Sequence, residues 1–148
     1  MSSLRLATLD DLDRLLPLVA GFHAEAGIEQ DDATRRGALT PLLEGSPHGA
    51  IWMIGPRVAP VGYVAVSFGW SIEFGGIDAF LDEIYVRERV RGRGMGSEAL
   101  TALSRALSGQ GVKAMHLEVD ADNERARALY ERMGFQSRNR YHLMTHLF

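Results

Sequence analysis

Three small groups of residues in this sequence could carry chemistry. Residues 91–96 read Arg-Gly-Arg-Gly-Met-Gly, Asp82 and Glu83 are adjacent acids, and Tyr130 follows Asn123 by seven positions. Glycines let a backbone turn tightly and approach a ligand closely, because they carry no Cβ. Carboxylates and a tyrosine hydroxyl can take up and give protons in catalysis. The sequence therefore indicates a ligand-binding loop together with acid–base groups.

The glycine-rich loop has the setting of an anion site. It follows an apolar run at 79–86 and opens a helical pattern at 96–107. A helix start presents unpaired N–H groups and the positive end of the helix dipole, so it favours an anion. Four arginines add donors suited to phosphate: Arg87, Arg89, Arg91 and Arg93.

Two common phosphate-binding motifs do not fit this loop. A Walker A loop needs Lys and Ser or Thr after its last glycine, but Ser97 and Glu98 follow Gly96. A dinucleotide fingerprint counted from Gly92 needs glycine or alanine at position 97, where the chain has serine. The anion is therefore bound by another kind of loop.

Residues 91–96 fit Arg-x-x-Gly-x-Gly, which resembles the pyrophosphate-binding loop of the GNAT superfamily of acyl-CoA N-acyltransferases. Residues 122–135, Asp-Asn-Glu-Arg-Ala-Arg-Ala-Leu-Tyr-Glu-Arg-Met-Gly-Phe, resemble the GNAT signature of Asn, a two-turn helix, Tyr and Gly-Phe. The resemblance implies that acetyl-CoA is the co-substrate. It implies coenzyme contacts from Ile84, Tyr85, Val86, Arg91, Gly92, Arg93, Gly94, Met95, Gly96, Ser97 and Asn123.

Two roles are open for each residue of the second signature. Tyr130 is either the acid that protonates the coenzyme sulfur, as the resemblance implies, or an aromatic packed in the core beside Leu129 and Met133. Asn123 is either a coenzyme contact or a helix N-cap, a position that favours Asn on its own account. The sequence favours the catalytic role for Tyr130 and leaves the roles of Asn123 equal.

Asp82 and Glu83 lie in an otherwise apolar run, where an unpaired carboxylate is costly. Their segment, Leu-Asp-Glu-Ile-Tyr-Val, resembles the spermidine/spermine acetyltransferase branch of the superfamily, which has an acidic pair here and uses the first acid as its suggested base. That family's pair is Glu-Asp, in the opposite order. Salt bridges to neighbouring arginines are the alternative for both acids.

The composition of the chain excludes or disfavours several other classes of function. With 148 residues, 46% of them hydrophobic, the chain is expected to form one domain, 1–148. It has no cysteine, which excludes disulfides and a cysteine acyl-enzyme, and His142 and His146 lack a third ligand, so no metal site is expected. The net charge of −3 disfavours nucleic acid and mildly favours cationic substrates. Without an apolar run of membrane length, we expect no membrane partner and a cytoplasmic location.

The expected elements follow in the order β-α-α-β-β-β-α-β-α-β. Strands are expected at 4–7, 49–54, 61–68, 79–86, 114–119 and 138–148, with a turn-rich link at 69–78. Helices are expected from a capping box at 8–11 to Gly27, at 31–44, at 96–107 and after Asn123. The expected fold class is α/β (α+β), and the resemblance implies a GNAT fold with a mixed, mostly antiparallel sheet and about four helices. The resemblance implies that strands 79–86 and 114–119 splay apart.

The predicted function is acetyl-CoA-dependent N-acetyl transfer to a small primary amine of the diamine or polyamine kind, by direct attack in a ternary complex. An acidic rim at Glu25, Glu29, Asp31 and Asp32 either attracts this amine or is a solvated face. An aminoglycoside, an amino acid or a protein N-terminus are alternative acceptors, and a non-catalytic acyl-CoA-binding module is an alternative of another class. The resemblance also leaves a homodimer open.

Overall fold

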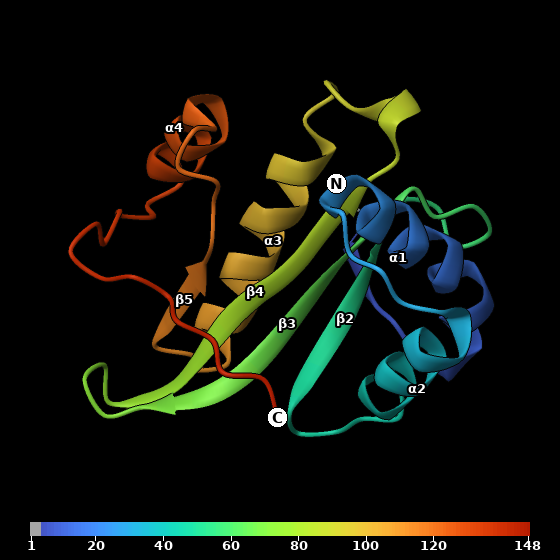
Figure 1. Ribbon diagram of the computed structural model, residues 1–148, viewed down its shortest axis with the longest axis horizontal. Coiled ribbons are helices and arrows are strands. Elements are labelled where there is room, and N and C mark those ends of the chain that lie inside the picture. Colours follow the sequence, from blue (N-terminus) through green and yellow to red (C-terminus); the bar gives the residue numbers. More distant parts are fainter. Residues whose placement is uncertain (1–3) are drawn as a thin grey trace. The chain divides into compact units, whose positions relative to one another are not determined.

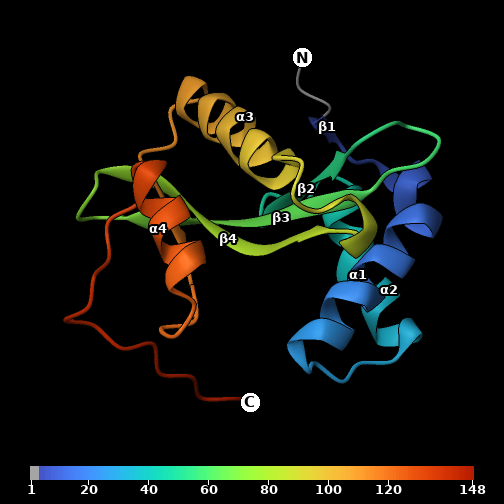
Figure 2. The same cartoon turned by 90° about the horizontal axis from the view of Figure 1, so that it is seen from above.

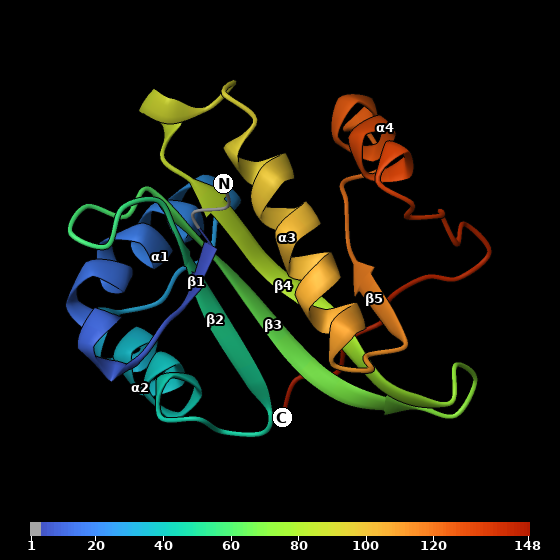
Figure 3. The ribbon, with the colours of Figure 1, turned by 180° about the vertical axis from the view of Figure 1, so that it is seen from behind.

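The chain up to Leu117 contains a mixed β-sheet (Figure 1). The computed structural model describes residues 4–148, in which the sheet has five strands. They lie in chain order, β1 to β5, as Figure 3 shows from behind. Their bounds are β1 Leu4–Leu6, β2 Gly49–Ile54, β3 Gly62–Ser71, β4 Gly76–Val86 and β5 Ala114–Leu117. Neighbours are antiparallel except β4 and β5, which are parallel, so the predicted mixed sheet is confirmed.

Helices cover both faces of this sheet (Figure 2). On one face lie α1, Leu12–Ala26, which follows the short 3-10 turn η1, Leu9–Asp11, and α2, Asp32–Leu43. On the other face lies α3, Met95–Gly109, which follows a second 3-10 turn, η2, Glu88–Val90. Gly27 ends α1 with a φ of 71°, the left-handed conformation that glycine tolerates and that commonly closes a helix.

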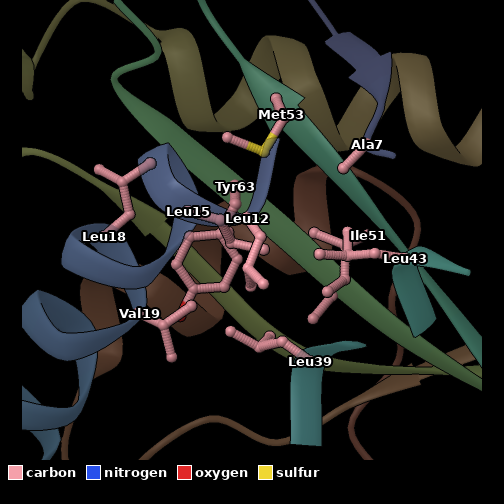
Figure 4. Packing of buried hydrophobic residues seen from close by; sticks show 11 residues of the cluster. Ala7, Leu12, Leu15, Leu18, Val19, Leu39, Leu43, Ile51, Met53 and Tyr63 are labelled. Atoms are coloured by element: carbon pink, nitrogen blue, oxygen red, sulfur yellow. The ribbon is translucent and has the colours of Figure 1, made fainter. Parts of the chain in front are cut away.

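The core under α1 and α2 is built from residues at helical and strand spacing (Figure 4). Leu15, Leu18 and Val19 of α1 and Leu39 of α2 pack there with strand residues such as Tyr63. Side chains alternate between the faces of a strand, so Val64 and Val66 lie on the α3 face. On that face Leu100, Leu103 and Leu107 of α3 are buried.

Two strand predictions need correction. The predicted link at 69–78 is mostly strand, because Gly69, Trp70 and Ser71 pair with Asp78, Ile77 and Gly76, which leaves a turn at 72–75. The predicted strand at 138–148 does not form. A strand needs a partner backbone as well as alternating side chains. Here Arg138 and Arg140 instead stack on the Tyr141 ring.

The contacts divide the chain into two compact units, one ending at Leu117 and one comprising Glu118–Phe148. Only the N-terminal unit contains the sheet. The C-terminal unit contains α4, Glu124–Arg132, which begins after Asn123 as the sequence predicts. Among the described residues, no helix is long and apolar enough to cross a membrane.

Candidate active site

Glu83 is held by two side chains from different elements. The Tyr63 hydroxyl of β3 donates to Glu83 Oε1 at 2.7 Å, and His23 Nε2 of α1 lies 2.9 Å from Glu83 Oε2. The Glu83 side chain keeps 19% of its surface exposed. A carboxylate has about four acceptor positions, and these contacts use two. Glu83 is therefore fixed in place and still open to a further partner.

His23 is in turn held by Arg35 of α2. Arg35 Nε donates to His23 Nδ1 at 3.3 Å, and both residues are buried, with 7% and 6% of their surface exposed. The same guanidinium donates to Asp32 Oδ1 at 2.6 Å and to the Gln30 carbonyl at 2.8 Å. We call Arg35, His23, Glu83 and Tyr63 the Glu83 cluster. It joins α1, α2, β3 and β4.

The Tyr63 hydroxyl keeps its proton, and so remains a hydrogen-bond donor, at neutral pH. Burial raises the pKa of its hydroxyl well above the usual range, and the charge and hydrogen bond of Glu83 raise it further. Because ionising Tyr63 would place a second negative charge beside the carboxylate, the proton stays on the phenol.

Asp82 and Glu83 lie in different surroundings because the strand is irregular between them. Ala65 of β3 pairs with Glu83, whereas the next residue, Val66, pairs with Leu81, so Asp82 is an extra residue in β4. Such a β-bulge re-aims side chains and is frequent next to active sites. Asp82 is exposed, whereas Glu83 points under α1. The two acids therefore do not form an equivalent pair.

The second half of β4 has an unpaired edge. Its pairing with β5 ends at Leu81 and Leu117, and in residues 4–148 no other strand joins that edge beyond this point. Arg87 N–H donates to Val61 on the β3 side. Backbone groups alternate along a strand, so the N–H groups of Ile84 and Val86 face the unpaired edge. These donors belong to residues for which the resemblance implies coenzyme contacts.

The glycine loop has room for a ligand. Gly92 and Gly94 have φ of 81° and 77°, so the turn itself requires them. Gly96 does not adopt a positive φ, and a Cβ atom at this position would meet no other atom within 4 Å. Glycine in a helix costs about 1 kcal/mol relative to alanine, so the fold gives no reason for Gly96. Close approach of a ligand to the start of α3 supplies one, and the loop therefore fits a coenzyme phosphate.

Arg91 is already engaged by protein groups. Its Nε donates to the Val86 carbonyl at 2.8 Å, and its NH2 group donates to Glu25 at 2.7 Å. The guanidinium also lies 5.5 Å from the centre of the Tyr85 ring. Its contact with the coenzyme stays a prediction, and in this structure the side chain ties the loop to α1 and β4. Arg93 is exposed on the same loop.

The acidic rim is largely structural. Glu25 pairs with Arg91, Asp32 pairs with Arg35, and the Asp31 carboxylate caps α2 by accepting from Thr34 N–H at 2.7 Å. That hydrogen bond lowers the pKa of Asp31. These contacts favour structural roles for three of the four acids.

Asn123 and Tyr130 belong to the C-terminal unit. The Asn123 side chain accepts from Ala126 N–H at 3.1 Å, so it is the N-cap of α4. Tyr130 is half-buried against Phe135, with ring centres 6.0 Å apart, and burial raises the pKa of its hydroxyl. The placement of both residues at the coenzyme stays a prediction from the sequence.

Sequence reasoning missed His23, Arg35 and Tyr63. A signal for the first two was present, because His23 continues the apolar spacing of Leu15 and Val19, and Arg35 lies four residues before Leu39. A polar residue at an inward-facing helix position needs a buried partner. Tyr63 gave no signal, since an aromatic residue is ordinary in a strand.

Residues 14–135 match the family model described as the acetyltransferase (GNAT) family. The match spans most of the 148 residues and crosses both units. This chain belongs to the GNAT acetyltransferase family. The predicted superfamily is thereby confirmed, whereas the spermidine/spermine branch stays a prediction.

Other GNAT proteins are similar over shorter or longer stretches. The chain is 41% identical over 59 residues to the uncharacterized N-acetyltransferase YycN of Bacillus subtilis, covering 40% of this chain and 38% of the relative. It is 47% identical over 58 residues to the mycothiol acetyltransferase of Streptomyces coelicolor, covering 37% of this chain and 19% of the relative. These matches span well under two thirds of either relative.

Similarity in structure extends over almost the whole chain. The crystal structure of integron cassette protein HFX_CASS3, from the mobile metagenome of Cole Harbour Salt Marsh, is 31% identical, with a TM-score of 0.86. The structural match covers 99% of this chain and 91% of the integron cassette protein. The predicted GNAT fold is confirmed. No group of three or more His, Cys, Asp or Glu side chains in the described residues could hold a metal ion.

Proposed function

We propose that this GNAT protein transfers an acetyl group from acetyl-CoA to a small, cationic primary amine of the diamine or polyamine kind. The amine attacks directly, in a complex that holds both substrates. The observation that carries this proposal is Glu83, a carboxylate fixed by Tyr63 and His23 beside the unpaired edge of β4 and still partly exposed.

Acetyl-CoA supplies the thioester whose carbonyl carbon is attacked. The residues that would hold it are the N–H groups of Ile84 and Val86, with Tyr85 between them, and the loop and first turn of α3. That second set comprises Arg91, Gly92, Arg93, Gly94, Met95, Gly96 and Ser97. The resemblance of the sequence to the GNAT signature adds Asn123. Open space at Gly96 and the start of α3, where the N-cap Gly94 makes no side-chain capping bond, support this assignment.

The acceptor must lose its proton before it can attack. An amine with a pKa near 10.4 costs about 4–5 kcal/mol to deprotonate at pH 7. Glu83 takes this proton directly or through one water. The nitrogen–carbon bond forms, the carbon–sulfur bond breaks, and Tyr130 gives its proton to the leaving sulfur. The nitrogen loses its second proton as the amide forms, and this proton restores the Tyr130 hydroxyl through solvent. Placement of the two reactants contributes more, about 7–11 kcal/mol.

Asp82 is assigned to the second ammonium of a diamine. It is exposed on the bulge next to Glu83, so one carboxylate can hold the distal charge while the other serves the reacting nitrogen. This division of roles favours Glu83 over Asp82 as the base, the reverse of what the resemblance to the polyamine branch implies.

Product analysis tests the proposal against its alternatives. The protein is incubated with acetyl-CoA and, separately, a diamine, an aminoglycoside, an amino acid and a peptide with a free N-terminus. Mass spectrometry should find a monoacetylated diamine in an amount that matches the CoA released. Acetyl transfer to the peptide or amino acid alone would reject the polyamine assignment. Acetyl-CoA binding without any product would favour the non-catalytic module.

A further inference from the structure

We infer that Arg35 and His23 are positioning residues that keep Glu83 facing two neutral hydrogen-bond donors, so that its carboxylate serves as a base. This inference rests on the proposed function, because it explains how Glu83 is prepared to take a proton. It assigns roles to two buried residues of α1 and α2 that do not themselves reach the acceptor.

The orientation of Arg35 is fixed independently of His23. Two of its nitrogens donate to the Asp32 carboxylate and to the Gln30 carbonyl, both within 2.8 Å. A guanidinium is planar, so these two bonds also set the direction of its Nε–H. That third donor points at His23 Nδ1, 3.3 Å away.

The direction of the Arg35 donor determines the tautomer of His23. Arginine has no acceptor and is always cationic, so Nδ1 of His23 must accept and cannot carry a proton. The ring proton therefore lies on Nε2, which donates to Glu83 Oε2 at 2.9 Å. If both ring nitrogens of His23 were protonated, its Nδ1–H would face the Nε–H of Arg35, and an imidazolium would be buried beside a guanidinium. His23 is therefore neutral.

A neutral His23 leaves Glu83 basic. A carboxylate that faces a cation holds its negative charge more firmly and takes up a proton less readily. With neutral His23 and protonated Tyr63 as partners, Glu83 is oriented by two hydrogen bonds and, among residues 4–148, faces no direct counter-ion. The charged and titratable groups in contact with the His23 ring are Arg35 from α2 and Glu83 from β4. In turn, Arg35 pairs with Asp32 of α2 and Glu83 accepts from Tyr63 of β3, while the charges of Asp82 and Tyr85 of β4 act on Tyr63.

A purely structural role would explain the same contacts, since they also tie two helices to the sheet. The two roles differ in what happens when Arg35 loses its Nε donor. A structural tie predicts lower stability only. The positioning role predicts that His23 Nδ1 becomes free to protonate, so that Glu83 faces an imidazolium and becomes a weaker base.

Nitrogen NMR of the histidine rings tests the tautomer without any need for turnover. His23→Gln assigns the His23 signals by their loss. We expect wild-type His23 to show a protonated Nε2 and a bare Nδ1 at neutral pH, as its contacts with Glu83 and Arg35 require. In Arg35→Met both ring nitrogens should be protonated near neutral pH. A doubly protonated or Nδ1–H ring in the wild type overturns the inference, even if Arg35→Met fails to fold.

Kinetics with the best amine acceptor supply the second readout. For Arg35→Met we expect kcat to fall about tenfold, within the range for general base catalysis, with the acid limb of its pH profile moved to lower pH and the KM for acetyl-CoA unchanged. His23→Gln keeps an amide donor near the Nε2 position and should retain most of kcat.

The matched control is His116→Gln. His116 also pairs with a β4 carboxylate, Asp78, at 3.1 Å, but outside the Glu83 cluster. This variant should leave kcat and its pH profile unchanged. A folded Arg35→Met protein with the wild-type ring state and acid limb overturns the inference. Failure of the proposed function is seen separately, as wild-type protein that acetylates no amine while the His23 ring has the expected tautomer.

Discussion

Glu83 and Asp82 are adjacent in the chain, yet the bulge in β4 gives them different surroundings. Glu83 is bound by Tyr63 and His23, whereas Asp82 is exposed. A fixed carboxylate suits proton transfer, which requires geometry. An exposed carboxylate suits attraction of a distal ammonium, which requires only proximity.

Charge removal at each acid should therefore have different kinetic effects. Glu83→Gln should lower kcat for a diamine by about 10²-fold or more, because a general base acts in the transition state. Asp82→Asn should mainly raise the KM of the diamine, by about three- to tenfold, because it loses one exposed charge contact. Steady-state CoA release, with circular dichroism to check folding, measures both. Equal effects on kcat would contradict this division of roles.

Tyr130 offers a similarly clean substitution. Tyr130→Phe keeps the ring that packs against Phe135 and removes only the hydroxyl. Burial raises the pKa of that hydroxyl, so it carries its proton at neutral pH and can give it to the leaving thiolate. We expect kcat to fall by about 10²-fold with the Kd of acetyl-CoA nearly unchanged. Wild-type turnover in this variant would make Tyr130 a packing residue.

The acidic pair could be recognised in the sequence because two acids in an apolar run need an explanation. Their partners could not be identified there. His23 is 60 positions from Glu83 and Tyr63 is 20 positions away, and only the packing of α1 and the register of β3 bring them together. The same packing explains why Arg91 is occupied by Glu25, 66 positions away.

The glycine loop and α3 form the element that we assign to the coenzyme. Gly96→Val should leave the free energy of unfolding within about 0.5 kcal/mol of the wild type, because a Cβ there meets nothing and valine is no worse than glycine in a helix. The same change should weaken acetyl-CoA binding by about tenfold or more in calorimetry, because the side chain fills the space assigned to the phosphates.

Gly109→Val is the matched control for this prediction. Gly109 ends the same helix, and a Cβ there also meets nothing within 4 Å. This variant should bind acetyl-CoA as the wild type does. If Gly96→Val bound equally well, the loop would not approach the coenzyme closely and the assignment would be wrong.

The junction between β1 and α1 predicts how stability depends on pH. Arg5 donates twice to the Asp11 carboxylate, at 2.9 Å each, and Thr8 N–H donates to it at 2.8 Å. The Arg5 hydrogen bonds, followed by that from Thr8, hold the pKa of Asp11 below its ordinary value. The stabilisation is thus complete above the unfolded pKa, near 3.9, and is lost as pH falls through the lower folded value.

Asp11→Asn should therefore destabilise the protein at pH 7 by about 1–3 kcal/mol, the range for charge-assisted hydrogen bonds. Urea unfolding at neutral pH and near pH 3 measures this effect. The difference between wild type and variant should shrink at the lower pH. A difference that is constant or grows on acidification would show that the Asp11 charge does not stabilise this junction.

Local patterns predicted most elements. The capping box, Gly27 and the glycine loop placed α1 and α3 closely, because caps and positive-φ glycines act through their immediate neighbours. The predictions at 69–78 and 138–148 were wrong because pairing with a partner strand determines whether these segments form strands. The glycines of the first stretch look like turn residues until β3 and β4 pair across them, and the alternation of the second creates no strand without a partner.

For the molecule as a whole, the family and the GNAT fold were predictable, because residues 79–135 carry both family motifs in one continuous stretch. The acceptor stays a proposal, because the side chains that we assign to it come from several elements. The net charge of −3 and the exposed Asp82 both favour a cationic acceptor. We therefore propose that the protein recognises a second positive charge on its amine substrate.

The measurement that tests this claim most directly compares a diamine with an amino alcohol of the same chain length. The two acceptors share the reacting amine and differ only in whether the far end is charged. We predict a kcat/KM for CoA release about tenfold or more higher for the diamine, a difference of about 1.4 kcal/mol, that shrinks as salt screens the charge. Equal kcat/KM values, or a preference for the amino alcohol, would contradict the account.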